Sequence, residues 1–415
     1  MTPGAPAQLL TTRFALITAS GLAYFTGWTM LYPILPRFVA DELGGGGLAV
    51  GTSIGIFGVS AALLRPLVGR WGDRNGRRVL TVGGMAVVAA SLLGYLLVDS
   101  VAEAIALRLV FGAGEAAAFV GLATAVQDLA PPERRGEAAS YFSVASFGGV
   151  AAGPPLGQWL FDRAGGGPAG FDRVWVGAAA MVLVGLVFGL AVPGRSGRPE
   201  PPSTGADPLA ARSTAIAEAV PGGRARLARF VHPASLRPGL ALCLALGGYS
   251  GFVSFVALFM SERGLGNPGV IFTMYAVIIV AFRLVFAKAP DRYGARLVSS
   301  ISCALLGAGL LLIAALGNRP GLYIGVVLFG AGMAVNFPAM LAVVVNLAGP
   351  DQRTFAVASL SAFFDVGFAL GAPVVGLVVK AGGVRSGLAV GGLMAWSALI
   401  VLRGIAPRPQ PALIG

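Results

Sequence analysis

Twelve apolar stretches of about twenty residues run through the sequence, and they restrict its fold more than any other feature. A helix of that length crosses roughly 30 Å of hydrocarbon at a rise of about 1.5 Å per residue. Only 12% of the residues are charged, whereas a soluble domain carries about 25%. The sequence therefore predicts an all-α membrane protein with twelve transmembrane helices, near residues 14–36, 48–69, 79–98, 102–126, 138–161, 174–193, 238–260, 268–287, 297–316, 321–346, 355–379 and 384–404.

One long polar segment, rich in Pro, Gly, Ser and Arg, divides these stretches six and six. Its composition is typical of a flexible linker, within which Asp207 to Val220 could form a short surface helix. We therefore expect a six-helix bundle over residues 1–193, a cytoplasmic linker over 194–237 and a second six-helix bundle over 238–415. The two cysteines lie inside predicted spans and the single histidine near the linker, so we expect no metal site.

The distribution of basic residues predicts the topology. With a cytoplasmic N-terminus, twenty of the 30 Lys and Arg residues fall on the cytoplasmic side and seven outside; Arg65, Arg108 and Arg283 lie within or at the edge of helices. This asymmetry places both termini in the cytoplasm. The net charge of +12 follows from it, and no basic stripe interleaved with aromatics points to nucleic acid. The bias toward Ala, Gly, Pro and Arg suggests a GC-rich bacterial genome, and so a plasma membrane.

The two halves of the chain repeat each other in one fixed, ungapped register. In this register charged and glycine positions coincide, which is rarer by chance than coincidence of apolar residues: Arg65 with Arg283, Asp73 with Asp291, Gly76 with Gly294, Gly112 with Gly330, Arg135 with Arg353 and Gly149 with Gly367. Two parallel six-helix halves with a substrate site at their interface is a plan that transporters use.

A charged turn is expected between the second and third stretches, from Gly69 to Arg78. Glycine permits the bend, and an aspartate there can pair with arginine or cap the next helix. The segment resembles the signature loop of the major facilitator superfamily, in which the acid and its basic partners latch the two halves on the cytoplasmic side. With the loop after the fourth span and the degenerate second copy, the expected gating residues are Gly69, Asp73, Arg74, Gly76, Arg77, Arg78, Asp128, Arg135, Asp291 and Arg292.

Two further motifs extend this resemblance. Arg108-x-x-x-Gly112-x-Gly114 is similar to the family motif whose arginine is linked to proton coupling. In the fifth span, small residues at a spacing of four permit close approach of another helix, and a proline adds a bend. This segment resembles the motif of the twelve-helix drug:proton antiporters, the efflux branch of the family; its residues are Gly149, Gly153, Pro154 and Gly157.

Only two acidic residues, Glu115 and Asp365, fall near the middle of predicted spans. Charges inside a membrane are costly and usually functional. Burial makes a carboxyl harder to ionise, which suits proton exchange near neutral pH. Glu115 follows Arg108 by two helical turns and shares a helix face with it, so the expected coupling residues are Glu115, Arg108 and Asp365. The alternative is that both acids are static structural charges.

Aromatic residues at a spacing of about four predict the wall of a substrate cavity. The residues expected there are Tyr24, Trp28 and Tyr32 in the first span, Phe252 and Phe255 in the seventh, and Asn336 in the tenth. The alternative for the aromatics is contact with lipid. We expect Arg65 and Arg283, at the cytoplasmic ends of their spans, to anchor to lipid phosphate or to latch loops in preference to binding substrate.

These features together predict a monomeric secondary transporter that exports a small organic or amphiphilic compound, such as a drug, antibiotic or metabolite, in exchange for protons by alternating access. A sugar or metabolite exporter and a proton-coupled importer of the same fold are alternatives, and a membrane receptor or lipid scramblase is a third. No phosphate-binding Gly-x-x-x-x-Gly-Lys loop and no nucleophile–base constellation occurs, so we expect neither an ATP-driven pump nor an enzyme, and no cofactor.

Overall fold

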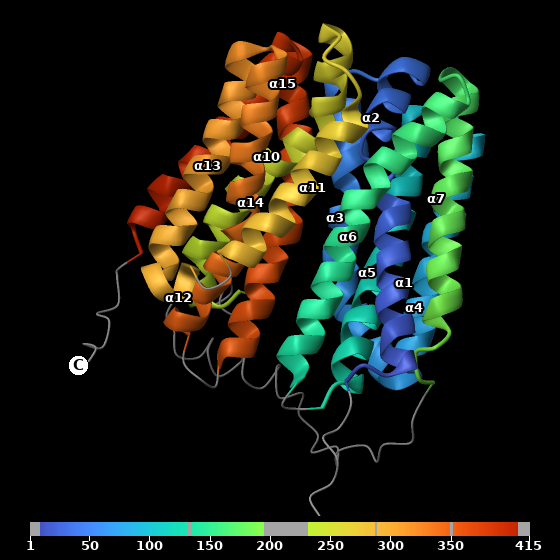
Figure 1. Cartoon of the computed structure of the whole chain (residues 1–415), viewed down its shortest axis with the longest axis vertical. Helices are drawn as coiled ribbons and strands as arrows, with labels where there is room; N and C mark the ends of the chain where they lie inside the picture. Colours follow the sequence, from blue (N-terminus) through green and yellow to red (C-terminus); the bar gives the residue numbers. More distant parts are fainter. Residues whose placement is uncertain (1–8, 132–133, 195–230, 287–288, 349–351, 406–415) are drawn as a thin grey trace, which may run out of the picture.

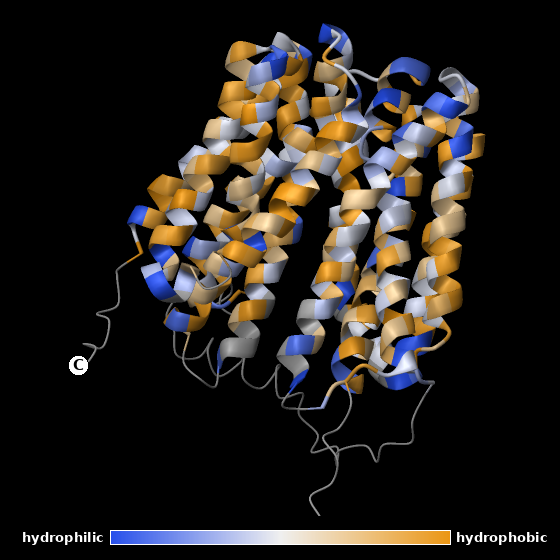
Figure 2. Ribbon diagram, in the orientation of Figure 1, coloured by the Kyte–Doolittle hydropathy of each residue, from blue (hydrophilic) through white to orange (hydrophobic). Residues whose placement is uncertain are grey.

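The computed structural model describes residues 9–131, 134–194, 231–286, 289–348 and 352–405. Within these ranges the chain is helical with connecting turns, and no strand occurs. Apolar residues cover the middle of the helices and polar residues gather toward their ends (Figure 2). Among the described residues, nine stretches are long and apolar enough to cross a membrane. The prediction of an all-α membrane protein is therefore confirmed.

The helices form two groups that lie side by side (Figure 1). The first contains α1 (Thr12–Thr29), α2 (Leu35–Arg37), η1 (Phe38–Glu42), α3 (Gly47–Asn75), α4 (Arg77–Gly94), η2 (Tyr95–Leu97), α5 (Val101–Leu129), α6 (Arg135–Arg163) and α7 (Gly167–Gly189). The second contains α10 (Pro233–Arg263), α11 (Pro268–Val285), α12 (Ala289–Tyr293), α13 (Ala295–Leu316), α14 (Arg319–Leu347) and α15 (Arg353–Arg403). We call the first group the first half and the second group the second half.

Nine membrane-crossing stretches are fewer than the twelve predicted, for two physical reasons. The long helix α15 bends at Gly383, whose φ is 77°, so it contains two predicted spans in one element. Helices α1 and α6 carry many Gly, Ser and Thr residues, which pack against other helices but lower the apolar character of the segment. Each of the twelve predicted stretches nevertheless overlaps a long helix or one arm of α15.

The internal repeat is visible in the local structure. Helices α5 and α14 begin and end at equivalent positions of the repeat, and α4 and α13 begin at equivalent positions. The N-caps of α5 and α14 are both polar. Ser100 Oγ accepts from the Glu103 amide at 3.3 Å, and Asn318 Oδ1 accepts from the Gly321 amide at 2.9 Å. The chain breaks between helices at Gly76 (φ 94°) and at Gly294 (φ 88°), where only glycine avoids a steric penalty.

Two boundaries differ from those expected. Helix α3 continues without a break through Gly69 and Gly72 to Asn75, so only Gly76 of the predicted charged turn leaves helical geometry. Helix α10 begins at Pro233, so the end of the segment assigned to the linker belongs to a helix. Most of the remaining linker, including the segment Asp207 to Val220, lies outside the described residues.

The two halves meet where α3 packs on α15 and α6 packs on α11. Gly51 and Gly55 of α3 lie directly against the backbone of Ala372 and Ala369 in α15, and a side chain at either glycine would collide with it. These contacts lie toward the end of the molecule away from residues 194 and 231, which we call the far end. At the opposite end, the linker end, the ribbons of the two halves diverge (Figure 1).

Candidate functional site

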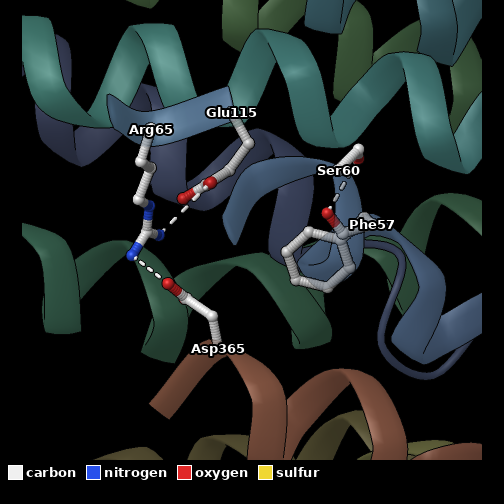
Figure 3. Close-up of polar contacts among 5 residues, drawn as sticks. All are labelled: Phe57, Ser60, Arg65, Glu115 and Asp365. Atoms are coloured by element: carbon white, nitrogen blue, oxygen red, sulfur yellow. Dashed lines mark hydrogen bonds and ion pairs between the residues drawn. The ribbon is translucent and has the colours of Figure 1, made fainter. Parts of the chain in front are cut away.

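Arg65 of α3 joins the two acidic residues predicted at mid-membrane (Figure 3). Its Nη1 donates to Asp365 Oδ2 at 2.7 Å, and its Nη2 lies 3.5 Å from Glu115 Oε2. Glu115 belongs to α5 in the first half, whereas Asp365 belongs to α15 in the second. The side chains of both acids are 8% exposed and that of Arg65 is 26% exposed. We call these three residues the charge cluster; its shortest ion pair connects the two halves.

The charge cluster is electrically unbalanced, because one guanidinium faces two carboxylates. With both acids ionised its net charge is −1, and a single proton would neutralise it. The contact to Glu115 is the longer and weaker of the two. The Arg65 guanidinium also lies over the Phe119 ring, 5.4 Å from its centroid, and Arg65 Nε has no hydrogen-bond partner within the described structure. A partly buried cluster with one excess negative charge is suited to bind a proton or a cation.

Close packing of α3 on α5 positions this cluster. Gly112 lies against Ser60 and the Phe57 carbonyl of α3, where any larger residue would push the helices apart. The hydroxyl of Ser60 donates back to that carbonyl at 3.0 Å (Figure 3). This approach allows Glu115, which lies one turn after Gly112, to reach Arg65 from the neighbouring helix.

Arg108 is buried and braces the same helix pair. Its Nε donates to the Ser53 carbonyl at 2.9 Å and its Nη2 to the Ile54 carbonyl at 3.3 Å. Its guanidinium lies 4.6 Å and 4.5 Å from the ring centroids of Phe57 and Phe111. Arg108 therefore makes no ion pair with Glu115, although the two share a helix. Its role in the described structure is to hold α5 against α3 next to the charge cluster.

The sequence places Arg65 and Arg283 at helix ends, anchored to lipid phosphate or to loops. This prediction is wrong for Arg65, whereas Arg283 does lie in the last turn of α11. Because α3 continues to Asn75, Arg65 lies well inside the helix and turns between the two halves. Arg283 also turns inward from α11: its Cζ is 4.1 Å from the centroid of the Phe147 ring in α6.

Two of the aromatic residues expected to line a cavity, Trp28 and Tyr32, pack into an aromatic layer that joins the two halves. Trp28, Phe57 and Phe111 form mutual contacts with centroid separations of 5.8–6.0 Å. The Phe57 ring then contacts Phe368 of the second half, at 5.4 Å. Tyr32 reaches Phe272 in the same way, at 5.9 Å. In this conformation the layer connects the two halves, and its rings are buried.

None of the six predicted cavity residues is more than 8% exposed in the described conformation. Phe255 lines one small cavity between the halves. Phe252 and Phe255 are fully buried in the second half. Asn336 is also buried, and its amide donates to Ser302 of α13 at 2.9 Å, away from the interface of the halves. Three polar atoms of these residues are buried without a hydrogen-bond partner in the described structure: Tyr24 Oη, Trp28 Nε1 and Asn336 Oδ1.

The expected gating residues lie at the linker end. Arg77 Nε is 3.5 Å from Asp128 Oδ2, an ion pair within the first half. Arg74, Arg78 and Arg292 are exposed. The side chains of Asp73, Arg135 and Asp291 lie outside the described part of the structure.

The small residues of α6 pack on α1. Gly149 and Gly153 face the α1 backbone and Gly157 faces the backbone of Met30 directly after it, so closely that a side chain at any of the three would collide. Thr29 Oγ1 of α1 lies 3.2 Å from the Gly149 carbonyl and can donate to it. Pro154, the fourth residue of this motif, is buried within α6 beside Pro155, and Pro155 contacts Gly269 of the second half. Helix α6 therefore lies between α1 and the second half. A change in the bend of α6 would alter its packing against both.

Several known proteins resemble this chain along most of its length. A relative from Salmonella typhimurium, the uncharacterized MFS-type transporter STM4428, is 29% identical over 377 residues, which cover 88% of this chain and 89% of the relative. The uncharacterized MFS-type transporter YhhS of Escherichia coli is 27% identical over 379 residues, covering 89% of this chain and 87% of that protein.

Solved structures share the fold at lower identity. The nucleoside transporter NupG, solved as a mutant, has a TM-score of 0.74 at 16% identity and covers 95% of this chain and 99% of its own. A bacterial homolog of the lysosomal transporter Spinster, solved in an inward-facing and unoccupied conformation, has a TM-score of 0.71 at 15% identity, with 96% of each chain covered. The human organic anion transporter MFSD10 has a TM-score of 0.65 at 20% identity, over 96% of this chain and 100% of its own.

The family model of the Major Facilitator Superfamily matches residues 17–270 and again residues 266–414, and so accounts for nearly all of the sequence. The second match starts close to the beginning of α11 and so lies on the second copy of the internal repeat. The chain therefore belongs to the Major Facilitator Superfamily and is a multi-pass membrane transporter of that type.

Proposed function

We propose that this transporter exports a small organic or amphiphilic compound in exchange for protons by alternating access. It works in the plasma membrane, with the linker and both termini in the cytoplasm. The observation that carries the proposal is the charge cluster, in which Arg65 holds Glu115 of its own half and Asp365 of the other. A titratable ion pair across the interface of two moving halves links the protonation state to the conformation.

The cluster has a simple coupling logic. When Asp365 is ionised, its 2.7 Å contact to Arg65 holds α3 against α15 and favours the described conformation, which is closed at the far end. A proton on Asp365 removes the charge that Arg65 binds, which weakens the contact between α3 and α15. Glu115, at 3.5 Å, remains as a second partner for Arg65 and as a second proton acceptor. The transporter then alternates between a state that carries a proton on these acids and a state that carries the exported compound.

Two observations favour export with the linker end in the cytoplasm. Basic residues concentrate on the side that holds the linker and the termini, in agreement with the positive-inside rule. The small-residue face of α6 packs on α1, in the segment that resembles the exporter motif. In this orientation the linker end, where the ribbons of the two halves diverge, lies in the cytoplasm (Figure 1). The Spinster homolog that shares the fold was solved facing inward.

Everted membrane vesicles test direction and coupling together. Vesicles acidified inside are treated with aromatic organic ions, namely 2-naphthoate, 2-naphthylmethylamine and ethidium, and loss of the pH gradient is followed by a pH-sensitive dye. We expect at least one compound to collapse the gradient faster with the wild-type protein than in vesicles without it, and none to do so with Glu115→Gln. Glu137→Gln is the matched control, because Glu137 forms an exposed ion pair with Arg134 at the start of α6.

Full compound-dependent collapse with Glu115→Gln would contradict the coupling role of Glu115. Compound uptake that strengthens with acid outside the everted vesicles, and not inside, would reverse the direction and favour the proton-coupled importer. A properly inserted wild-type protein that moves no compound of a broad screen would favour a receptor.

A further inference from the structure

The internal repeat relates the contacts of Arg65 to those of Arg283. The two arginines occupy equivalent positions of the repeat, and so do Phe147 and Asp365. In the structure Arg65 contacts Asp365, and Arg283 lies over Phe147 at 4.1 Å. The same junction between the halves therefore occurs twice, at α3–α15 and at α11–α6, once as an ion pair and once as a cation–π contact.

The second contact of each arginine also lies at a corresponding place in the repeat. Arg65 reaches Glu115 on α5, whereas Arg283 Nε donates at 3.3 Å to the Ala334 carbonyl on α14, at the repeat position next to that of Glu115. This carbonyl is available because Pro338, one helical turn later, has no amide hydrogen to donate. Arg283 is thus held by a ring and a backbone dipole where Arg65 is held by two carboxylates.

The charge at the two junctions is consequently opposite. The cluster at Arg65 carries one excess negative charge, while Arg283 has no acidic partner within the described residues. Its side chain is half-buried, and its terminal nitrogens are left accessible and make no hydrogen bond in the described structure. A guanidinium in this state can accept a planar oxyanion in a bidentate geometry, which matches carboxylate well.

We propose that Arg283 is the binding point for an anionic group of the transported compound, a carboxylate or a similar oxyanion, and that Phe147 packs against its aromatic body. This inference rests on the proposed function, in that the compound bound here is the one that is moved. The two junctions share no helix, so the anionic group is bound at a different seam from Glu115 and Asp365. An anion that draws Arg283 from Phe147 loosens α6–α11, as a proton on Asp365 loosens α3–α15.

The test is a binding measurement on the purified, full-length protein in detergent. The probes are 2-naphthoate, 2-naphthylmethylamine and 2-naphthylmethanol, which share one aromatic body and differ in charge. A ligand that binds the folded state raises the melting temperature with concentration, and the dependence yields a Kd. We expect 2-naphthoate to bind the wild-type protein at least about ten-fold more tightly than either analogue, a difference of about 1.4 kcal/mol.

Three variants locate the binding. Arg283→Gln should weaken 2-naphthoate by about ten-fold or more and leave the two analogues unchanged. Phe147→Asp gives Arg283 an internal carboxylate and should abolish 2-naphthoate binding while it raises the melting temperature of the unliganded protein. The matched control is Arg263→Gln, because Arg263 also lies over a phenylalanine ring and near a backbone carbonyl, but at the far end; its affinity should equal that of the wild type.

Absence of saturable stabilisation of the wild type by 2-naphthoate would overturn the inference. So would equal affinity for the amine, or an unchanged affinity in Arg283→Gln. These outcomes are separate from failure of the exchange mechanism, because binding in detergent requires no proton gradient. Charge-selective binding that depends on Arg283, combined with no proton exchange in vesicles, would retain the anion site and reject the coupling.

Discussion

Replacing Asp365 with asparagine removes the charge from the shortest ion pair between the two halves while it preserves the size of the side chain. In the described conformation Asp365 accepts from Arg65 Nη1 at 2.7 Å, next to the tightly packed face of α3. The far end is closed when this contact forms. The variant should therefore shift the protein toward conformations that are open at the far end.

The geometry sets the size of the shift. A hydrogen bond that involves charged groups contributes about 1.5–3 kcal/mol to stability. Arg65 is 26% exposed, and it keeps Glu115 as a neighbour at 3.5 Å, so the lower part of this range applies. A loss of about 1.5–2 kcal/mol corresponds to a change of roughly 10- to 30-fold in the ratio of closed to open molecules.

Distances between spin labels across the far end measure this ratio. Asp41 and Glu262 line one small cavity of about 300 Å³ between the halves, and Glu42 is exposed beside it. Labels attached to Glu42→Cys and Glu262→Cys, in a background without the two native cysteines, should show a longer distance population in Asp365→Asn. A distance distribution identical to that of the parent would refute the idea that this ion pair favours closure. Glu137→Gln, which loses an ion pair at the start of α6, should leave the distribution unchanged.

Three further variants test other parts of the structure. Gly153→Leu places a side chain against the α1 backbone and should destabilise the protein by about 1–3 kcal/mol; thermal unfolding checks this against Gly83→Leu, where the space is open. Trp28→Ala removes a nearly buried ring from the aromatic layer and should cost about 3–5 kcal/mol in the same assay, with loss of transport in vesicles; full stability would show that the layer is loosely packed. Arg108→Lys keeps the charge but cannot reproduce both donations to the carbonyls of Ser53 and Ile54, so exchange in vesicles should fall about ten-fold at equal protein level; unchanged exchange would limit Arg108 to packing.

The parts of the fold that can be predicted from the sequence are those that the membrane and the repeat dictate. Apolar length determines where helices cross, because a backbone inside hydrocarbon must satisfy its hydrogen bonds internally. Repeated polar and glycine positions determine where helices begin, as the N-caps Ser100 and Asn318 and the breaks at Gly76 and Gly294 illustrate. The acids Glu115 and Asp365 stand out for a related reason, since a charge inside a span is unusual.

Sequence periodicity cannot supply the partner of these acids. A glycine-rich charged segment follows Arg65 and suggests a helix end there, yet that segment is helical up to Asn75. The direction of the Arg65 side chain depends on how α3 is rotated against α15, which is set by the contacts of Gly51 and Gly55 with the α15 backbone. The available signal is the repeat, because Arg65 and Arg283 coincide in it while their neighbours across the interface differ.

The aromatic stripes show a second limit. A spacing of four places Tyr24, Trp28 and Tyr32 on one face of the first span, and all three lie on the buried side of the molecule. Periodicity does not reveal whether such a face is open or covered in a given conformation. In the described conformation the second half covers it, through Phe272 and Phe368.

Paired flux measurements in proteoliposomes test most directly the claim that Glu115 and Asp365 carry the exchanged proton. Purified protein is reconstituted with a pH indicator inside, and movement of 2-naphthoate and of protons is followed in the same preparation. The wild type should move both in opposite directions, and Glu115→Gln and Asp365→Asn should show no 2-naphthoate-dependent proton flux although they are folded and still bind the probe. Full proton flux from either variant would contradict the account.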